Sequence, residues 1–289
     1  MLPVNGATFT FTATTTEDHG IFTKQEGMKL ADCTADNVGD VFDKDGNIYK
    51  VSIGPGALYT NYTSYYGVWL KAGMFYTSTP RLKSTIPASP GIAVIAYVGD
   101  NGSVETGSEY RGLAIAMYDS NTQQFSGTSW CAQSSATCTS EYNTDLTVAR
   151  EWKDGISKTA TLVNNSDGHT HNAAKAASNF KVSYPSDTSG WFLASLGQWQ
   201  LILQGLITKQ DNLSQPYSVP VSTTPNEKMT ADYLKPILGN AGTGLGNCYW
   251  TSSEYSASEV WTMAPSNGAV YTETKTGTFY HVRPVIAFK

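Results

Sequence analysis

The sequence predicts an α+β fold in which strands come first, helices follow and strands return at the end. Strand patterns lie between residues 7 and 120, helical patterns between 166 and 240, and strand patterns again in the last 40 residues. A parallel sheet would instead need strands and helices that alternate along the chain. With 289 residues, 40% of them hydrophobic, the chain is long enough to bury a substantial core.

The first strands are predicted by alternation and by turn residues. The stretch ATFTFTATTT (7–16) alternates apolar residues with Thr, as a half-buried strand does. The stretch VGDVFDKDGNIYKVSI (38–53) predicts a hairpin around an Asp-Gly turn. An EF-hand is excluded there, because Gly54 stands where the closing glutamate of the calcium loop belongs. Residues 54–86, rich in Gly, Tyr and Thr, are expected to form an insertion with short strands.

Two apolar runs, GIAVIAYVGD (91–100) and RGLAIAMYDS (111–120), predict a buried antiparallel pair. Near the end, VWTMAPSNGAVYTET (260–274) predicts a hairpin with Asn267-Gly268 at its turn. HVRPVIAF (281–288) predicts the closing strand, which we expect to lie beside residues 91–98.

Helical patterning predicts three segments. SDGHTHNAAKAASNFKV (166–182) has a run of Ala, with Asp167 or Thr170 as its N-cap. His169 and His171 near its start are interpreted as cap-region residues rather than as a metal site. SLGQWQLILQGL (195–206) follows a Ser N-cap and places apolar residues on one helical stripe. MTADYLKPILGN (229–240) predicts a short helix that Pro236 kinks or breaks.

Composition excludes several classes of function. Charged residues make up 15% of the chain and the net charge is -5, which gives no basic footprint for nucleic acid. No apolar run approaches the roughly 20 residues that span a bilayer, and no secretory signal segment opens the chain. Cys131 and Cys138 lie seven apart in a Ser-rich loop, where they form either a disulfide or two free thiols. A disulfide would favour the periplasm or the cell surface.

Several motifs resemble one family. GWFLASLGQWQLIL (190–203) is similar to the Trp-containing segment that leads into the second helix of C-type-lectin-like domains. CYWTSSEYSASEVW (248–261), SNGAV (266–270) and HVRPVIAF resemble the tail of such domains in the variable proteins of diversity-generating retroelements, particularly Bacteroides-like ones. Formylglycine-generating-enzyme-like domains are wider relatives. The chain departs from the family at Ala194, where Pro is usual.

This resemblance implies a C-type-lectin-like domain over residues 36–289, preceded by a β-rich segment at 1–35 that resembles the end of a stalk or Ig-like domain. The resemblance is good over about residues 160–289. In the retroelement systems that this resemblance implies, adenines of a template sequence are mutated, chiefly in Asn codons. Such codons can then encode Tyr, Ser, Thr, Ala, Gly, His, Phe or Asp, but not Trp, Met, Glu, Lys or Gln. We call the first group the permitted set. Residues 276–281, TGTFYH, all fall within it.

The predicted ligand face consists of permitted residues in this tail. They are Tyr255, Ser256, Ala257, Ser258, Thr262, Ala264, Tyr271, Thr272, Thr274, Thr276, Gly277, Thr278, Tyr280 and His281. The residues between them are expected to be scaffold: Trp250, Glu254, Glu259, Trp261, Met263, Glu273 and Lys275. Val282, Val285 and Phe288 are expected to anchor the core with the tryptophans, while their neighbours point to solvent. Arg283 is expected to be structural, paired with Glu254 or exposed.

The predicted function is therefore non-enzymatic binding of a protein or glycan at a cell surface or outside the cell, with no cofactor and no metal. A Thr- and Tyr-rich exposed hairpin without diversification is the plainer alternative. Others are a fimbrial or phage-tail subunit, a calcium-dependent lectin, whose usual sugar motifs are absent, and a formylglycine-generating-like oxidase. The oxidase would need a cysteine pair near the C-terminus, where Cys248 stands alone.

Overall fold

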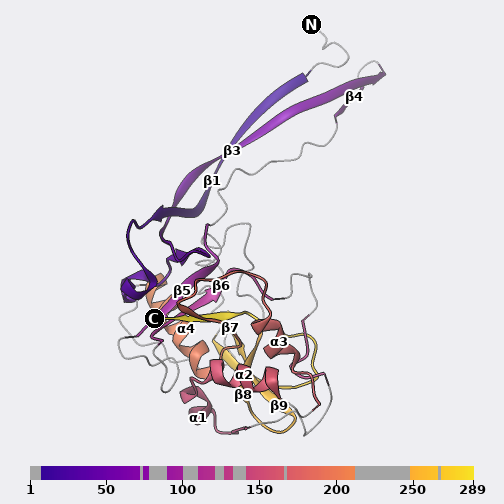
Figure 1. Ribbon diagram of the computed structural model, residues 1–289. Helices are drawn as coiled ribbons and strands as arrows, with labels where there is room; N and C mark the ends of the chain where they lie inside the picture. Colours follow the sequence, from indigo (N-terminus) through magenta and orange to yellow (C-terminus); the bar gives the residue numbers. More distant parts are fainter. Residues whose placement is uncertain are drawn as a thin grey trace.

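The computed structural model describes residues 8–71, 74–77, 90–99, 110–120, 127–132, 141–165, 168–211, 248–265 and 268–289. It combines helices with two antiparallel sheets, which confirms the predicted α+β class. Figure 1 shows a body that holds the helices together with β8 and β9, and a long ribbon of β1 and β3 that projects from it.

Within the described residues the main sheet has the strand order β1-β3-β2-β5-β6-β11-β7, and β4 pairs with β3 off this path. All its pairs are antiparallel. Its strands are β1 (Thr8–Lys24), β2 (Val41–Phe42), β3 (Ile48–Lys71), β4 (Met74–Thr77), β5 (Ala93–Val98), β6 (Gly112–Ala116), β7 (Thr188–Phe192) and β11 (Val285–Phe288). Two 3-10 turns, Leu30–Asp32 and Ala35–Asn37, join β1 to β2.

The closing strand takes a different place from the predicted one. β11 lies between β6 and β7, not beside residues 91–98. The reason is that both edges of β5 are already occupied, by β2 on one side and by its hairpin partner β6 on the other. The predicted pairing of β5 with β6 and the predicted hairpin of β2 with β3 are both confirmed.

The N-terminal segment and the predicted insertion form one ribbon. β1 pairs with β3 from Thr8↔Tyr66 to Lys24↔Tyr49, across the predicted boundary at residue 35. Over residues 54–71 one long strand, β3, takes the place of the short strands expected there, with β4 pairing at its far end. Residues 72–73 and 78–86 of the predicted insertion lie outside the described residues. At the root of the ribbon, Phe22 and Val51 pack against the main core.

The second sheet has the order β10-β9-β8 and carries the C-terminal hairpin. Its strands are β8 (Tyr249–Glu254), β9 (Glu259–Ala264) and β10 (Ala269–Thr274). The predicted β9–β10 hairpin is confirmed by the pair Ala269↔Ala264. Gly268, the residue before β10, has φ +67°, a conformation that L side chains rarely adopt. Asn267 lies outside the described residues.

Four helices are described: α1 (Leu146–Glu151), α2 (Gly155–Asn164), α3 (Asn172–Ser178) and α4 (Leu196–Asp211). α4 buries the predicted stripe of Leu196, Trp199, Ile202, Leu203 and Leu206, and each such side chain contributes about 1.5–3 kcal/mol. The segment 229–240, predicted to be a helix, lies outside the described residues. Among the described helices, none is long and apolar enough to cross a bilayer.

α3 begins at Asn172, one residue later than an N-cap at Thr170 would place its start. His171 is the N-cap residue in place of Asp167 or Thr170, because regular helical geometry starts only at Asn172. Its ring is buried and meets the Trp130 ring edge-on, with centroids 5.4 Å apart. His171 therefore lies in the cap region, as expected.

Two apolar clusters hold the second sheet between them. Trp261 and Met263 of β9 belong to the main core, with α4 and the strands of the main sheet. Trp250 and Val260 belong to a second cluster, with residues of α2 and α3 and with Trp130. Val282, Val285 and Phe288 are buried, as predicted for core anchors.

Candidate functional site

Most of the predicted ligand face lies at the surface of the second sheet and of the segments that follow β8 and β10. Ser258, Tyr271, Thr274, Thr276 and Thr278 are exposed. The half-buried members are Tyr255, Ser256, Ala257, Thr272, Gly277, Tyr280 and His281. The Lys275 N–H donates to the Ser258 carbonyl at 2.9 Å, so the segments 255–258 and 275–281 lie side by side. We call these exposed and half-buried residues the candidate face.

Thr262 and Ala264 were expected on this face, and the structure corrects that expectation. Both are buried, Thr262 completely. β9 is the central strand of its sheet, and apolar clusters cover it on both sides. Alternate residues of a strand point to opposite faces, so neither set of β9 side chains reaches solvent. The rule that neighbours of buried residues are exposed applies only where one face of a sheet is open.

Exposed aromatic side chains lie on or near the candidate face. Tyr271 is 41% exposed and Phe279 is 86% exposed. Phe279 falls in the permitted stretch 276–281 but was not among the residues assigned to ligand binding. Tyr142, 54% exposed, forms an isolated bridge with Glu254. Its position depends on a contact between segments more than a hundred residues apart, so no local sequence signal identifies it.

The turn between β8 and β9 is fixed by its own hydrogen bonds. The Ser256 hydroxyl accepts from the N–H groups of Ser258, at 3.3 Å, and Glu259, at 3.1 Å. The Tyr255 ring meets the Trp261 ring edge-on, with centroids 4.9 Å apart. Ser256 is therefore part of the structure of the turn as well as part of the candidate face.

The Tyr280 side chain is half-buried and packs against the second apolar cluster. Its ring lies 4.7 Å from the ring of Trp250, which is buried and donates through Nε1 to the Thr128 carbonyl at 2.6 Å. Burial raises the pKa of the Tyr280 phenol, and its hydrogen bond to Glu273 raises it further. Tyr280 thus stays neutral at physiological pH.

A buried charge cluster lies beneath the candidate face. The Glu254 carboxylate, at the end of β8, is 0% exposed. Lys275 Nζ lies 2.6 Å from one of its oxygens, and Lys158 Nζ of α2 lies 3.2 Å from the other. Lys275 Nζ also lies 5.0 Å from the centre of the Trp130 ring. Burial lowers the pKa of Lys275, and Glu254 opposes part of that shift. The cluster ties β8, α2 and the segment after β10 together.

A second buried cluster corrects the predicted partner of Arg283. Arg283 Nε lies 2.9 Å from Asp119 and not beside Glu254, which is occupied by the two lysines. His281 Nδ1 lies 3.1 Å from the same Asp119 carboxylate. Arg283 is buried and also donates to the Ala116 carbonyl. The expectation that Arg283 is structural agrees with this burial, and the cluster holds one end of the candidate face at His281.

Three of the four cysteines lie among the described residues. Cys131 is disulfide-bonded, and its predicted partner, Cys138, lies outside them. Cys33 and Cys248 are free, and burial raises the pKa of both thiols, that of Cys33 to about 12. In the described part of the chain, no three His, Cys, Asp or Glu side chains are grouped so that they could hold a metal ion.

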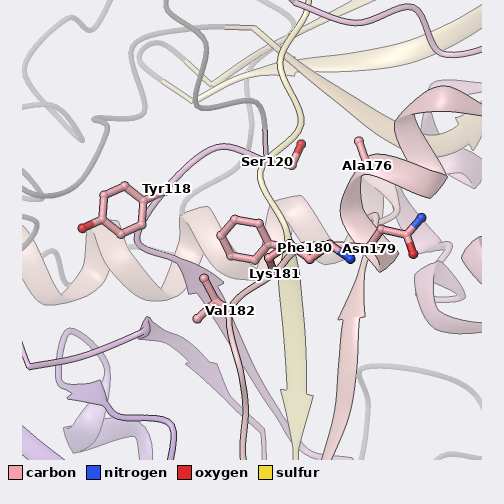
Figure 2. Close-up of a pocket in the computed structure, with 7 residues that line it drawn as sticks. All are labelled: Tyr118, Ser120, Ala176, Asn179, Phe180, Lys181 and Val182. Carbon is pink, nitrogen blue, oxygen red and sulfur yellow. The ribbon is translucent and has the colours of Figure 1, made fainter.

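A cavity of about 330 Å³ is lined by residues on both sides of Asp119 in sequence, Tyr118 and Ser120, and by residues of the segment 176–182 (Figure 2). Phe180 and Val182 are apolar members of its lining. Of the described residues that line it, none belongs to the candidate face. The cavity is therefore separate from the predicted ligand-binding residues.

Comparisons with known proteins add little to this geometry. No known protein family matches the chain, and no curated protein matches it. The solved structure of a fimbrial protein from Bacteroides ovatus is similar, with 16% identity and a TM-score of 0.45. The match covers 87% of this chain and 48% of that one, so the chain spans about half the length of the fimbrial protein. Similarity at this level identifies neither a family nor a function.

Proposed function

We propose that this chain is a non-enzymatic binding protein that presents a diversified surface on a C-type-lectin-like scaffold, for adhesion or receptor recognition. The ligand is a protein or glycan, and the surface is the candidate face. The site of action is the cell surface or the extracellular space.

One observation carries the proposal: most of the predicted face is exposed or half-buried, whereas most of the predicted scaffold is buried. Trp250, Glu254, Trp261, Met263 and Lys275 are outside the permitted set, and all are buried. Apart from Thr262 and Ala264, the predicted face residues are exposed or half-buried, while Glu259 and Glu273 of the predicted scaffold are half-buried. Permitted residue types elsewhere in the tail, such as Thr251, Ser252 and Ser253, are buried as well. Substitution at exposed positions usually changes stability by less than about 0.5 kcal/mol. Such a division lets a surface vary while its framework stays fixed.

The composition of the candidate face suits recognition. Tyr271 and Tyr280 supply large and fairly rigid contact areas, while the Thr, Ser and Gly residues around them adapt to different partners. The buried cluster at Glu254 is formed with Lys158 and Lys275, and these three residues do not belong to the candidate face. Binding surfaces of this composition gain affinity from a pre-organised framework.

A display experiment tests this function. A library randomised at Tyr271, Thr274, Thr276 and Thr278 should yield folded binders to several unrelated proteins or glycans. A matched library randomised at Thr262, Ala264, Trp261 and Met263 should yield mostly unfolded chains. If the surface library gives no binders, or if both libraries lose the fold equally, the proposal is wrong. A near-duplicate DNA repeat beside the gene, together with a reverse transcriptase, is the genetic counterpart that we expect.

The projecting ribbon favours a second candidate, a structural or tip subunit of a larger assembly in which the candidate face does not vary. β1 and β3 extend well beyond the body that holds the helices (Figure 1). This role is compatible with binding at the tip. The two candidates differ in whether the tail varies, which sequencing of the gene decides.

A further inference from the structure

The ribbon of β1 and β3 has open edges. β1 is the terminal strand of the main sheet, and no described residue pairs with its outer edge from Thr8 to Lys24. On the other edge, β2 reaches only Tyr49 of β3 and β4 begins only at Gly67. Between those points the described structure is a ribbon of two strands.

A ribbon of this kind needs a further partner. At about 3.3 Å per residue, the pairing from Thr8 to Lys24 is roughly 50 Å long. A two-stranded ribbon is marginally stable in water, and a third strand or a packed face is needed to hold it. At its root, Phe22, Tyr49 and Val51 pack against the core. Beyond the root, the described strand pairs supply no third strand until β4 at Gly67.

Over residues 8–16 the outer edge of β1 lacks two of the features that usually prevent strand pairing, charge and proline. Natural edge strands are blocked by charged residues, proline or bulges. Residues 8–16, TFTFTATTT, contain no charge and no proline, and the acidic residues of β1 begin only at Glu17. Its register shift lies near the tip, between Phe9 and Phe11. β3, by contrast, carries Pro55 within the ribbon. The open edge is thus that of β1.

We propose that β1 pairs edge to edge with β1 of a second copy of this chain. The pairing is antiparallel and gives a four-stranded sheet in which the two β1 strands are central. An antiparallel strand edge is complementary to itself, so a two-fold axis satisfies both copies at once and closes the assembly as a dimer. Pairing of β1 with β3 of another copy would leave free edges at both ends and would continue into a fibre.

Charge sets the register of this pairing. When the two-fold axis passes near Thr12, residues 8–16 of one copy lie beside residues 16–8 of the other. Glu17 and Asp18 of both copies then fall outside the overlap, so no like charges face each other. Like charges directly opposite across two strands would destabilise the pair.

The dimer goes beyond the proposed function and does not depend on it. β8 and β9 lie in the body, away from the ribbon tip (Figure 1). Pairing through β1 therefore leaves both copies of the candidate face free. Two linked binding surfaces can raise overall affinity by roughly 10²–10⁴-fold when the target presents repeated sites.

The mass of the full chain in solution tests the proposal. Light scattering at about 100 μM, well above a micromolar dissociation constant, should give twice the chain mass of 31.2 kDa. Thr12→Lys places two like charges together at the axis and should weaken the dimer by tenfold or more. Asn61→Lys is the matched control, because Asn61 lies beside Thr12 on β3, one strand away from the interface. It should leave the dimer intact.

Amide hydrogen exchange supplies the second measurement. In the dimer, consecutive amides of residues 8–16 should all be protected, and half of them should lose protection on dilution or in Thr12→Lys. A monomeric wild-type chain at about 100 μM would overturn the proposal. So would equal weakening by the two lysine variants, or protection that does not change with concentration, which would place the third strand within the same chain.

Discussion

Glu254→Gln should destabilise the protein severely, because it removes the one carboxylate that two buried ammonium groups share. Lys158 and Lys275 lie 3.2 and 2.6 Å from the Glu254 oxygens, and both lysines are almost wholly buried. Breaking a buried ion pair by removing one partner costs about 3–5 kcal/mol. For a chain of this size, 1 kcal/mol lowers Tm by about 2–4 °C. The expected loss is therefore roughly 6–20 °C, measured by calorimetry and by denaturant unfolding.

The pH dependence of the variant supplies a sharper check. Burial already lowers the pKa of Lys275 below its ordinary 10.5, and Glu254 opposes that effect. Without Glu254 the folded-state pKa falls further, so the unfolded chain binds more protons than the folded one. The stability of Glu254→Gln should then recover as pH rises toward 10.5.

The matched control is Glu259→Gln, the same change at a half-buried position on the neighbouring strand. It should cost less than about 1 kcal/mol. If Glu254→Gln loses no more stability than Glu259→Gln and shows no recovery at alkaline pH, the buried cluster does not stabilise the segments that carry the candidate face.

Three further changes probe other parts of the site. Ala264→Leu should cost about 1–3 kcal/mol by overpacking, whereas Thr276→Leu, at an exposed position, should change unfolding free energy by less than about 0.5 kcal/mol; equal effects in a denaturant titration would contradict the burial pattern. Ser256→Ala should cost about 1 kcal/mol, since two N–H groups lose their acceptor, and Ser256→Thr should restore most of it. Burial raises the pKa of Tyr249 from 10.0 to about 12, so between these pH values the folded chain holds a proton that the unfolded chain has lost. The neutral Tyr249 phenol therefore contributes fully to the free energy of unfolding below pH 10, and this contribution is lost as pH rises through 12. Over that window wild type should lose about 2–3 kcal/mol more than Tyr249→Phe, and parallel pH curves for the two proteins would argue against this origin.

Local patterns predicted the fold well where one short segment contains the whole signal. The apolar stripe of α4, the pairing of β5 with β6 and the turn at Gly268 are examples, and each depends on neighbours within about twenty residues. α2 was not predicted, because its buried side includes Lys158 and Thr159, which interrupt the helical spacing of apolar residues. A helix that buries a lysine against a distant glutamate gives no hydrophobic stripe.

Features set by distant contacts could not be predicted in the same way. The neighbours of β11 depend on which sheet edges are already filled, and the partner of Arg283 depends on where Asp119 comes to lie. Among the residues predicted for the ligand face, residue type predicted a surface position for most of them. It failed at Thr262 and Ala264, because a strand covered on both sides buries small permitted residues as readily as tryptophans.

Deep sequencing of codons 248–289 in a natural population of the source cells or phage tests the central claim most directly. The claim predicts many substitutions at the exposed positions Tyr271, Thr274, Thr276 and Thr278, and constancy at the buried Trp261 and Lys275. Substitutions spread evenly over exposed and buried codons, or a tail that never varies, would contradict it.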